Sequence, residues 1–214
     1  MNTYLRRPGC ARVLLKRGAE AELRRIDWHG RAAVEKARLP KAYRHETLDD
    51  ELRRSRIRME ARLMAEARRF GVSIPVLYDV DLEGHRIVME FVDGPTVKEV
   101  LQKRLADPRQ LAHEIGRLAG TLHAHGIVHG DLTTSNLLWR EARLFAIDFS
   151  MGEKTDSIEA RGVDLRLLKE AWTSAHFDLL PLFDEVLAAY REACPHADEA
   201  IAKLAEIEDR GRYT

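Results

Sequence analysis

Apolar and turn-forming residues divide the chain into a strand-rich beginning and a helix-rich remainder. Residues 12–36 contain short Val/Leu runs interrupted at Gly18 and at His29-Gly30, a pattern typical of strands joined by tight turns. The runs IPVLYDV (74–80) and HRIVMEFV (85–92) flank the turn DLEG and predict a second strand pair. The chain therefore begins with a small β-sheet.

A long helix is predicted between these two groups of strands. Asp49 or Asp50 is a suitable N-cap, and Gly71 is the kind of residue that commonly ends a helix. The apolar residues that recur at helical spacing, and are expected to face the core, are Leu52, Met59, Leu63 and Phe70.

The triplet Asp93-Gly94-Pro95 interrupts the pattern and suggests a boundary between two lobes. Beyond it, Thr96–Leu105 and Pro108–His125 have helical periodicity, and residues 137–148 form short apolar runs split by REAR. Most of the chain after residue 158 has the pattern of helices. Strands plus one helix, a breaker, and then helices around a small β element indicate an α+β protein with two unequal lobes.

Composition narrows the class of protein. Hydrophobic residues make up 45% and charged residues 33% of the 214 positions, as in soluble globular proteins. No apolar run approaches the roughly 20 residues needed to cross a bilayer, and the N-terminal sequence lacks a secretion signal, so a cytoplasmic protein without membrane contact is expected. Cys10 and Cys194 are isolated and predict free thiols.

Charge is unevenly distributed along a chain whose formal net charge is zero. Residues 1–70 carry 19 Lys/Arg against 10 Asp/Glu, a net charge of +9, and the remainder carries −9. Such an excess favours an anionic partner near the N-terminal part, with solvated helix faces as the simpler alternative.

The stretch HGIVHGDLTTSN, residues 125–136, carries the candidate chemistry. Asp131 and Asn136 are separated by four residues, the interval of H-R-D-L-x-x-x-N, in which a carboxylate orients the attacking group and an amide holds a metal ion. Asp148 follows twelve residues after Asn136 in FAIDFS, where a carboxylate can bind Mg²⁺ that bridges phosphates. This order and spacing predict phosphoryl transfer.

Two simpler interpretations of the same stretch remain open from the sequence. His125 and His129 are four residues apart, as in metal-binding helices, although Gly126 and Gly130 argue against a regular helix. Asp131 is alternatively a helix N-cap followed by turn residues.

Phosphoryl transfer of this type also needs a strand lysine for the phosphates and a helix glutamate that pairs with it. Lys36 lies at the end of a β-like run in AAVEKAR, and Glu60 lies in the middle of the long helix beside the apolar stripe. A carboxylate there is costly to bury unless it is paired, which favours a Lys36–Glu60 pair. An ordinary solvated lysine and glutamate are the alternative.

With these residues in place, the chain resembles the family of the small atypical kinase/ATPase subunit of the KEOPS (EKC) tRNA-modification complex. The resemblance runs from about Lys16 to His176, with a further match in the C-terminal Arg-Gly-Arg. The segment 41–64 is the most diagnostic, because general kinases lack this run before the helix glutamate. The matching pieces are KRGAEA (16–21), VEKARLPKAYRHETLDDELRRSRIRMEARLM (34–64), HGIVHGDLTTSN (125–136) and IDFSMG (147–152).

The resemblance implies a compact bilobal protein-kinase-like fold in the α+β class. It consists of a small β-rich N-lobe, residues 1–92, and a mostly helical, reduced C-lobe, residues 93–214, within a single kinase-like domain. The cofactors implied are ATP and Mg²⁺. Asp131 matches the catalytic base, His129 a brace of its loop, and Asn136 and Asp148 the magnesium ligands. The residues implied in ATP binding are Gly18, Ala19, Glu20, Lys36, Glu60, Met89, Glu90 and Phe91.

The chain departs from the family pattern at Ser150 and in its C-terminal tail, and from protein kinases in general by lacking a docking segment. Ser150 stands where the family usually has Gly after Asp-Phe, and is expected to restrict loop movement. No A-P-E motif or long activation segment follows, which leaves little platform for docking a protein substrate. The C-terminal EDRGRYT resembles the family's basic tail but carries only Arg210 and Arg212, so a frayed terminus is an alternative.

By resemblance, the function is that of an ATP-dependent atypical serine/threonine kinase/ATPase that supports threonylcarbamoyladenosine modification of tRNA. The implied partners are a transferase subunit of sugar-kinase-like fold, a small regulatory subunit, and tRNA, to which the basic residues 38–69 are expected to contribute contacts. The alternatives are a RIO-type kinase or small-molecule phosphotransferase, and a nucleotide-binding scaffold whose chemistry is dispensable.

Overall fold

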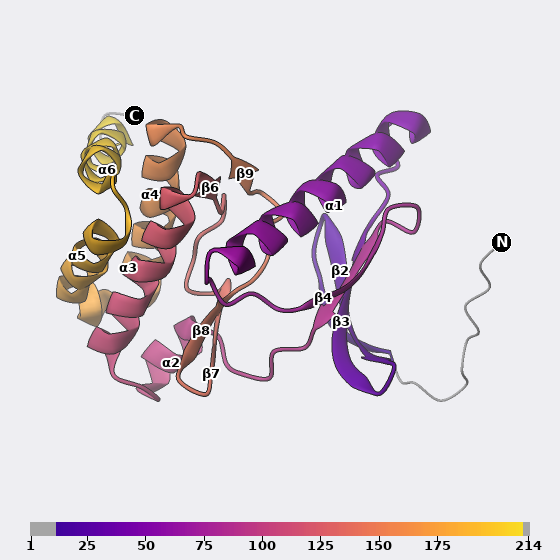
Figure 1. The fold of residues 1–214 in the computed structure, drawn as a ribbon, viewed down its shortest axis with the longest axis horizontal. Helices are drawn as coiled ribbons and strands as arrows, with labels where there is room; N and C mark the ends of the chain where they lie inside the picture. The colour runs from indigo at the N-terminus through magenta and orange to yellow at the C-terminus, as the bar shows by residue number, and fades with distance from the viewer. Residues whose placement is uncertain (1–11, 212–214) are drawn as a thin grey trace. The chain divides into compact units, whose positions relative to one another are not determined.

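A computed structural model describes residues 12–211 and divides the chain into two compact units (Figure 1). The first unit consists of Met1–Ala61 and Pro75–Phe91, and the second of Arg62–Ile74 and Val92–Thr214. The predicted long helix therefore contributes residues to both units.

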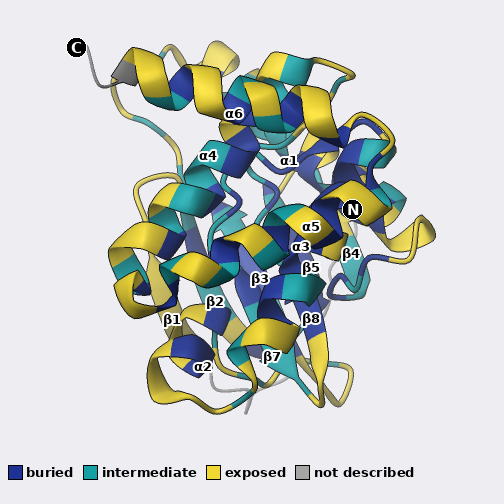
Figure 2. Ribbon diagram, turned by 90° about the vertical axis from the view of Figure 1, so that its left-hand side faces the viewer, coloured by how far each residue is buried: buried dark blue, intermediate teal, exposed yellow. Residues whose placement is uncertain are grey.

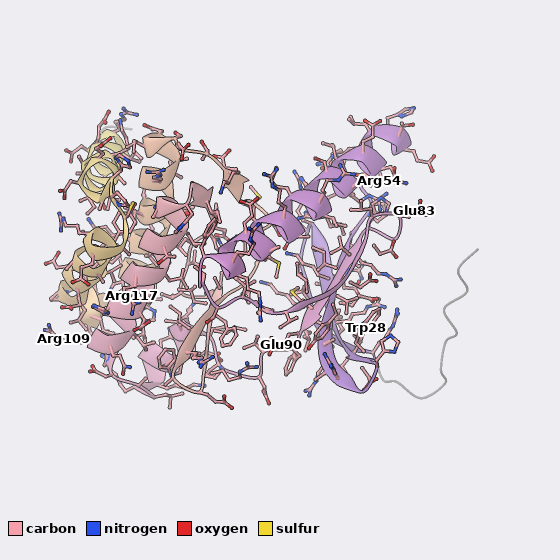
Figure 3. All side chains as sticks on the ribbon, viewed as in Figure 1. Trp28, Arg54, Glu83, Glu90, Arg109 and Arg117 are labelled. Atoms are coloured by element: carbon pink, nitrogen blue, oxygen red, sulfur yellow. The ribbon has the colours of Figure 1, made fainter. Side chains whose placement is uncertain are left out.

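The first unit contains an antiparallel sheet of the order β1-β2-β3-β5-β4. Its turns fall where the sequence predicted them, at Gly18, at His29-Gly30 and between β4 and β5. Figure 3 shows Trp28 and Glu83 at opposite ends of the sheet, since Trp28 ends β2 and Glu83 lies in the turn between β4 and β5. The strands are β1 (Val13–Arg17), β2 (Ala21–Trp28), β3 (Arg31–Arg38), β4 (Leu77–Asp81) and β5 (Arg86–Glu90).

The two faces of this sheet have different compositions, because side chains alternate along each strand. One face carries the buried apolar residues Ile26, Ala33 and Val88, with Trp28 and Tyr78 packed against them. The opposite face carries the charged side chains of Lys36 and Arg38, both of which contact Glu60 of the long helix. The sheet thus directs two strand cations toward one helix carboxylate.

Helix α1 (Glu46–Arg69) begins three residues before the predicted N-cap, so the prediction of Asp49 or Asp50 at that position is wrong. Asp49 is instead buried and accepts a hydrogen bond from Arg53, with Oδ2 and Nε 2.7 Å apart. The helix ends at Arg69, just before Gly71, the residue predicted to stop it, whose φ of +86° suits glycine. The N–H groups of Gly71 and Val72 donate to Arg68 and Ala67, the pattern of a Schellman motif.

The buried stripe of α1 differs from the predicted one. Met59 and Phe70 are each 39% exposed, whereas Leu63 is fully buried. The stripe that is buried consists of Ile57, Glu60, Leu63, Met64 and Ala67. A carboxylate therefore occupies a core position, and the apolar residues beside it lie on the solvent side.

The second unit is mostly helical. Buried and exposed residues alternate along α5 and α6, as expected of helices that cover a core (Figure 2). Its helices are α2 (Val97–Lys103), α3 (Pro108–Ala124), α4 (Ile158–Ala175), the 3₁₀ helix η1 (Phe177–Leu182), α5 (Phe183–Ala193) and α6 (Ala197–Gly211). Its strands are β6 (Ile127–Val128), β7 (Leu137–Arg140), β8 (Arg143–Ala146) and β9 (Glu153–Lys154).

Two short strand pairs of the second unit hold the loops that carry the candidate chemistry. β6 pairs with β9, and β7 pairs with β8, both antiparallel. Residues 129–136 lie between β6 and β7, and residues 147–152 lie between β8 and β9. The two polar motifs of the sequence are therefore loops fixed at each end by strands.

Among the residues described, no helix is long and apolar enough to cross a membrane. Cys194 is a buried free thiol, as predicted, and Cys10 lies outside the described residues.

Candidate active site

Three charged side chains of the first unit form a buried cluster. Lys36 Nζ is 2.5 Å from Glu60 Oε1, so the predicted pair is present. Arg38 Nη2 donates to the other oxygen, Glu60 Oε2, at 2.9 Å. The side chains of Lys36, Arg38 and Glu60 are 5%, 3% and 1% exposed, which excludes the alternative of a solvated lysine and glutamate.

Arg38 was missed in the sequence, although a signal for it exists. It lies two residues after Lys36, so on a strand both side chains project from the same face. A search for further cations on the strand face of the predicted lysine–glutamate pair would have identified Arg38.

The loop Gly18–Glu20 is exposed and tied to its own unit by several contacts. Lys41 Nζ donates to Ala19 O at 2.6 Å, and the carboxylate of Glu20 pairs with Arg56 Nη1 at 2.5 Å. Gly18 N–H donates to Ala21 O at 2.9 Å. The loop therefore has a defined position, and the role of these three residues in nucleotide binding stays a prediction.

At Met89, Glu90 and Phe91, the predicted adenine contact, two main-chain N–H groups already have acceptors in the first unit. The N–H of Glu90 donates to Val76 O at 2.8 Å, and the N–H of Phe91 donates to Ala32 O at 3.2 Å. These two N–H groups are engaged within the first unit, and the role of the three residues in adenine binding stays a prediction. Glu90 is labelled at the end of β5 in Figure 3.

In the second unit, Asp131 and Asn136 are joined by direct hydrogen bonds. Asn136 Nδ2 donates to Asp131 Oδ2 at 2.7 Å and to Asp131 O at 2.9 Å. Because both contacts use the amide nitrogen, the amide oxygen of Asn136 is directed elsewhere, as a hard oxygen ligand for a metal requires. No helix starts at residues 131–136, so the N-cap interpretation of Asp131 is wrong.

His129 fixes the loop from within the core. Its Nε2 lies 3.0 Å from Ile147 O, and since a carbonyl only accepts, Nε2 carries the proton. Nδ1 then accepts from the N–H of Asp131 at 3.4 Å, a long contact. Burial holds the pKa of His129 below its ordinary value, and the Asp164 carboxylate offsets this only in part, so the ring is neutral. The geometry matches the predicted brace.

Asp164 on α4 is a further residue that the sequence did not reveal. Its carboxylate accepts from the N–H of His129 at 2.7 Å, from the N–H of Gly130 at 2.9 Å and from His123 Nε2 at 3.2 Å. Burial alone would raise the pKa of Asp164, but the hydrogen bond and charge of His123 with the N–H of His129 bring it below the ordinary value. An ionised carboxylate therefore holds the backbone just before Asp131.

Asp148 adopts the left-handed backbone conformation, with a φ of +64°, which Asp tolerates better than most residues. Its Oδ1 accepts a hydrogen bond from the hydroxyl of Ser150 and a long one, 3.4 Å, from the Ser150 N–H. A glycine at this position could supply only the second contact. Ser150 therefore orients the Asp148 carboxylate as well as limiting backbone freedom.

The histidine metal site left open by the sequence is not formed. Among the described residues, no group of three or more His, Cys, Asp or Glu side chains could hold a metal ion. His125 instead places Nδ1 2.9 Å from Thr121 O and stacks on Phe70, with ring centroids 3.7 Å apart. Mg²⁺ usually binds through one or two carboxylates together with substrate phosphates, so Asp148 and Asn136 fit a magnesium ion that arrives with a nucleotide.

Replacing Ser150 by Ala is expected to weaken the apparent affinity for Mg²⁺ by roughly tenfold, as for other residues that orient a metal ligand. The reason is the loss of the hydroxyl that holds Asp148 Oδ1. Magnesium titration of nucleotide binding, followed by calorimetry, measures the effect. Ser150→Thr keeps the hydroxyl and serves as the control; an equal loss in both variants would contradict the role of the hydrogen bond.

Most of the basic residues at 38–69 are engaged within the chain. Arg44, Arg53, Arg54, Arg56 and Arg62 each lie within ion-pair distance of a carboxylate. Arg58 and Arg69 are exposed and make no ion pair with the residues described. Much of the positive charge is therefore balanced locally, and a smaller set is available to an anionic partner.

The predicted basic tail is partly helical. Arg210 lies in the last turn of α6, pairs with Glu206 and has Nη1 3.6 Å from Glu159. Arg212 lies outside the described residues.

Comparisons with known proteins agree with this geometry. A family model described as the RIO domain matches residues 29–163. The structure of a Rio2 kinase–ADP/Mg²⁺–phosphoaspartate complex from Chaetomium thermophilum aligns with a TM-score of 0.61 over 94% of this chain and 71% of that chain, at 18% identity. The fold and the matched model together define an atypical protein kinase, and the predicted α+β kinase-like fold is confirmed.

Sequence relatives refine the class. The KEOPS complex subunit Bud32 of Pyrococcus abyssi is 41% identical over 210 residues, covering 94% of this chain and 96% of that protein. A probable bifunctional tRNA threonylcarbamoyladenosine biosynthesis protein of Methanobrevibacter smithii is 40% identical over 203 residues, but these cover only 37% of that relative. The chain belongs to the Bud32 family, which confirms the resemblance seen in the sequence.

Proposed function

We propose that the chain is the ATP-dependent kinase/ATPase subunit of a KEOPS-type assembly and supports threonylcarbamoyladenosine modification of tRNA. The observation that carries the proposal is the Asp131–Asn136 contact, which presents a carboxylate and an amide oxygen in the arrangement that phosphoryl transfer uses. Family membership supplies the biological context, because a full-length relative is named a KEOPS complex subunit.

Each candidate site residue has its own role in the proposed phosphoryl transfer. Lys36, held by Glu60, would bind the α- and β-phosphates of ATP. Asp131 would orient a hydroxyl or water and accept its proton. Asn136 and Asp148 would hold magnesium. Magnesium held there would supply positive charge that offsets the negative charge developing during phosphoryl transfer. His129 and Asp164 keep the loop of Asp131 in place.

Three partners follow from the family and are part of the proposal: a transferase subunit of sugar-kinase-like fold, a small regulatory subunit, and tRNA. The exposed Arg58 and Arg69 on α1 are the candidates for RNA phosphate contacts, since most neighbouring arginines are paired with carboxylates. The location of such an assembly would be the cytoplasm.

Reconstitution with these subunits tests the proposal. In Lys36→Met, formation of threonylcarbamoyladenosine on tRNA and ATP consumption should both fall by roughly a hundredfold, because the phosphates lose a fixed cation. Lys98→Met, an exposed lysine on α2, is the matched control and should behave as wild type. Full modification by Lys36→Met without ATP consumption would favour the scaffold alternative.

The same assembly tests the RNA contact. Changing Arg58 and Arg69 together to Glu should reduce the salt dependence of tRNA binding, since fewer counterions are released. An unchanged slope would remove these arginines from the RNA surface and leave the catalytic proposal intact.

A further inference from the structure

Glu60 of α1 is bound by two strand cations, and each takes a different carboxylate oxygen. Lys36 Nζ lies 2.5 Å from Oε1, and Arg38 Nη2 lies 2.9 Å from Oε2. Both cations come from β3, two residues apart, and the N–H of Arg38 donates to His85 O at 2.9 Å, which fixes the end of that strand. The cluster is thus a triad rather than a simple lysine–glutamate pair.

Because Glu60 is buried, the presence of Arg38 as a second cation affects what Lys36 can do. Glu60 is 1% exposed, so water cannot solvate its carboxylate if a partner leaves. A lysine that is the only partner of such a carboxylate is held back from any other anion, because moving toward it leaves the buried charge unpaired. An arginine on the second oxygen removes this conflict, since its guanidinium stays charged and keeps a fixed geometry.

The position of Arg38 lowers the stability of the fold, which indicates that its guanidinium serves a function. Its Nε is buried without a hydrogen-bond partner among the residues described. An unsatisfied buried donor lowers stability, and a lysine-glutamate pair alone would have avoided it. The chain therefore retains a guanidinium here at some expense in stability.

We propose that Arg38 is a positioning residue: it holds the Glu60 carboxylate in place when Lys36 binds the phosphates of the nucleotide. This inference rests on the proposed function, because it assumes that Lys36 contacts phosphate. It adds a residue that sets how strongly the phosphates, rather than the nucleoside, are bound.

The test compares ADP with adenosine, which differ by the phosphates. For wild type and Arg38→Met, calorimetry in the presence of Mg²⁺ gives the dissociation constants of both ligands. The ratio of the adenosine constant to the ADP constant should fall roughly tenfold in Arg38→Met, the loss expected for one hydrogen bond between charged groups. The adenosine constant itself should not change.

Two further variants separate positioning from general destabilisation. Arg53→Met removes another arginine–carboxylate pair of the first unit, in which Arg53 Nε lies 2.7 Å from Asp49 Oδ2, and its ratio should equal that of wild type. Arg38→Lys keeps the charge and should restore part of the ratio. If Arg38→Met fails to fold, Arg38→Gln replaces it in the same measurement.

An unchanged ratio in a folded Arg38 variant overturns the inference while leaving the proposed function standing. A wild-type protein that binds adenosine and ADP equally well contradicts the proposed role of Lys36, and the inference falls with it. A lower melting temperature with an unchanged ratio likewise reduces Arg38 to a structural residue and counts against the inference.

Discussion

Replacing Asp131 by Asn is expected to lower ATP turnover by about three orders of magnitude, the usual contribution of a positioned general base. Asparagine has nearly the same shape and still offers an oxygen to Asn136 Nδ2, which now lies 2.7 Å from Asp131 Oδ2. The loop should therefore stay folded, while the group proposed to accept the proton is lost. Steady-state phosphate release, measured with and without the transferase subunit, tests this expectation.

Two controls make that result interpretable. The dissociation constant for ADP should be nearly unchanged in Asp131→Asn, because the proposed role of Asp131 is to act on the attacking group. Asp198→Asn, at an aspartate of α6 whose side chain is 86% exposed, should turn over ATP like wild type. Equal turnover in Asp131→Asn and wild type would remove the catalytic assignment and leave a nucleotide-binding scaffold.

The parts of the site that the sequence predicted are those that depend on short spacing. Asp131 and Asn136 lie on one loop, so an interval of four residues is enough to bring them into contact. The strands and turns of the first unit were predicted for the same reason, since alternation and glycine-containing turns act over a few residues. Lys36 and Glu60 are farther apart, and they were predicted by family pattern and by the cost of burying an unpaired carboxylate.

The parts that the sequence did not predict depend on contacts between distant segments. Asp164 holds residues 129 and 130 from a helix more than thirty positions later, and nothing near it in the sequence marks it as a loop anchor. The apolar stripe of α1 was misplaced because Glu60 occupies a core position. The ion pairs of Glu60 with two cations of the sheet turn that face of the helix inward. Met59 and Phe70, which the apolar periodicity predicted to be buried, are therefore exposed.

The anchor at Asp164 allows a second strong prediction. Asp164→Asn should lower the free energy of unfolding by about 3 to 5 kcal/mol, as when one partner of a buried charged cluster is removed. In the folded chain, Oδ2 receives the N–H of His129 and His123 Nε2, and Oδ1 receives the N–H of Gly130. In Asp164→Asn, the amide nitrogen replaces one of these two oxygens and faces a hydrogen-bond donor. At least one buried N–H group therefore loses its acceptor.

The pH dependence of stability distinguishes this mechanism from a simple packing defect. The folded pKa of Asp164 is below its unfolded value, so its ionised form contributes stability that is present above about pH 4 and is lost as the pH falls through the folded pKa. Asp164→Asn should lack this acid-dependent part. Denaturant unfolding at pH 7 and at lower pH measures both effects, with Asp198→Asn, whose side chain is 86% exposed, as the control expected to resemble wild type. If Asp164→Asn were as stable as wild type, the carboxylate would be dispensable for holding the catalytic loop. If it were destabilised by the same amount at every pH, packing rather than the ionised carboxylate would account for the loss.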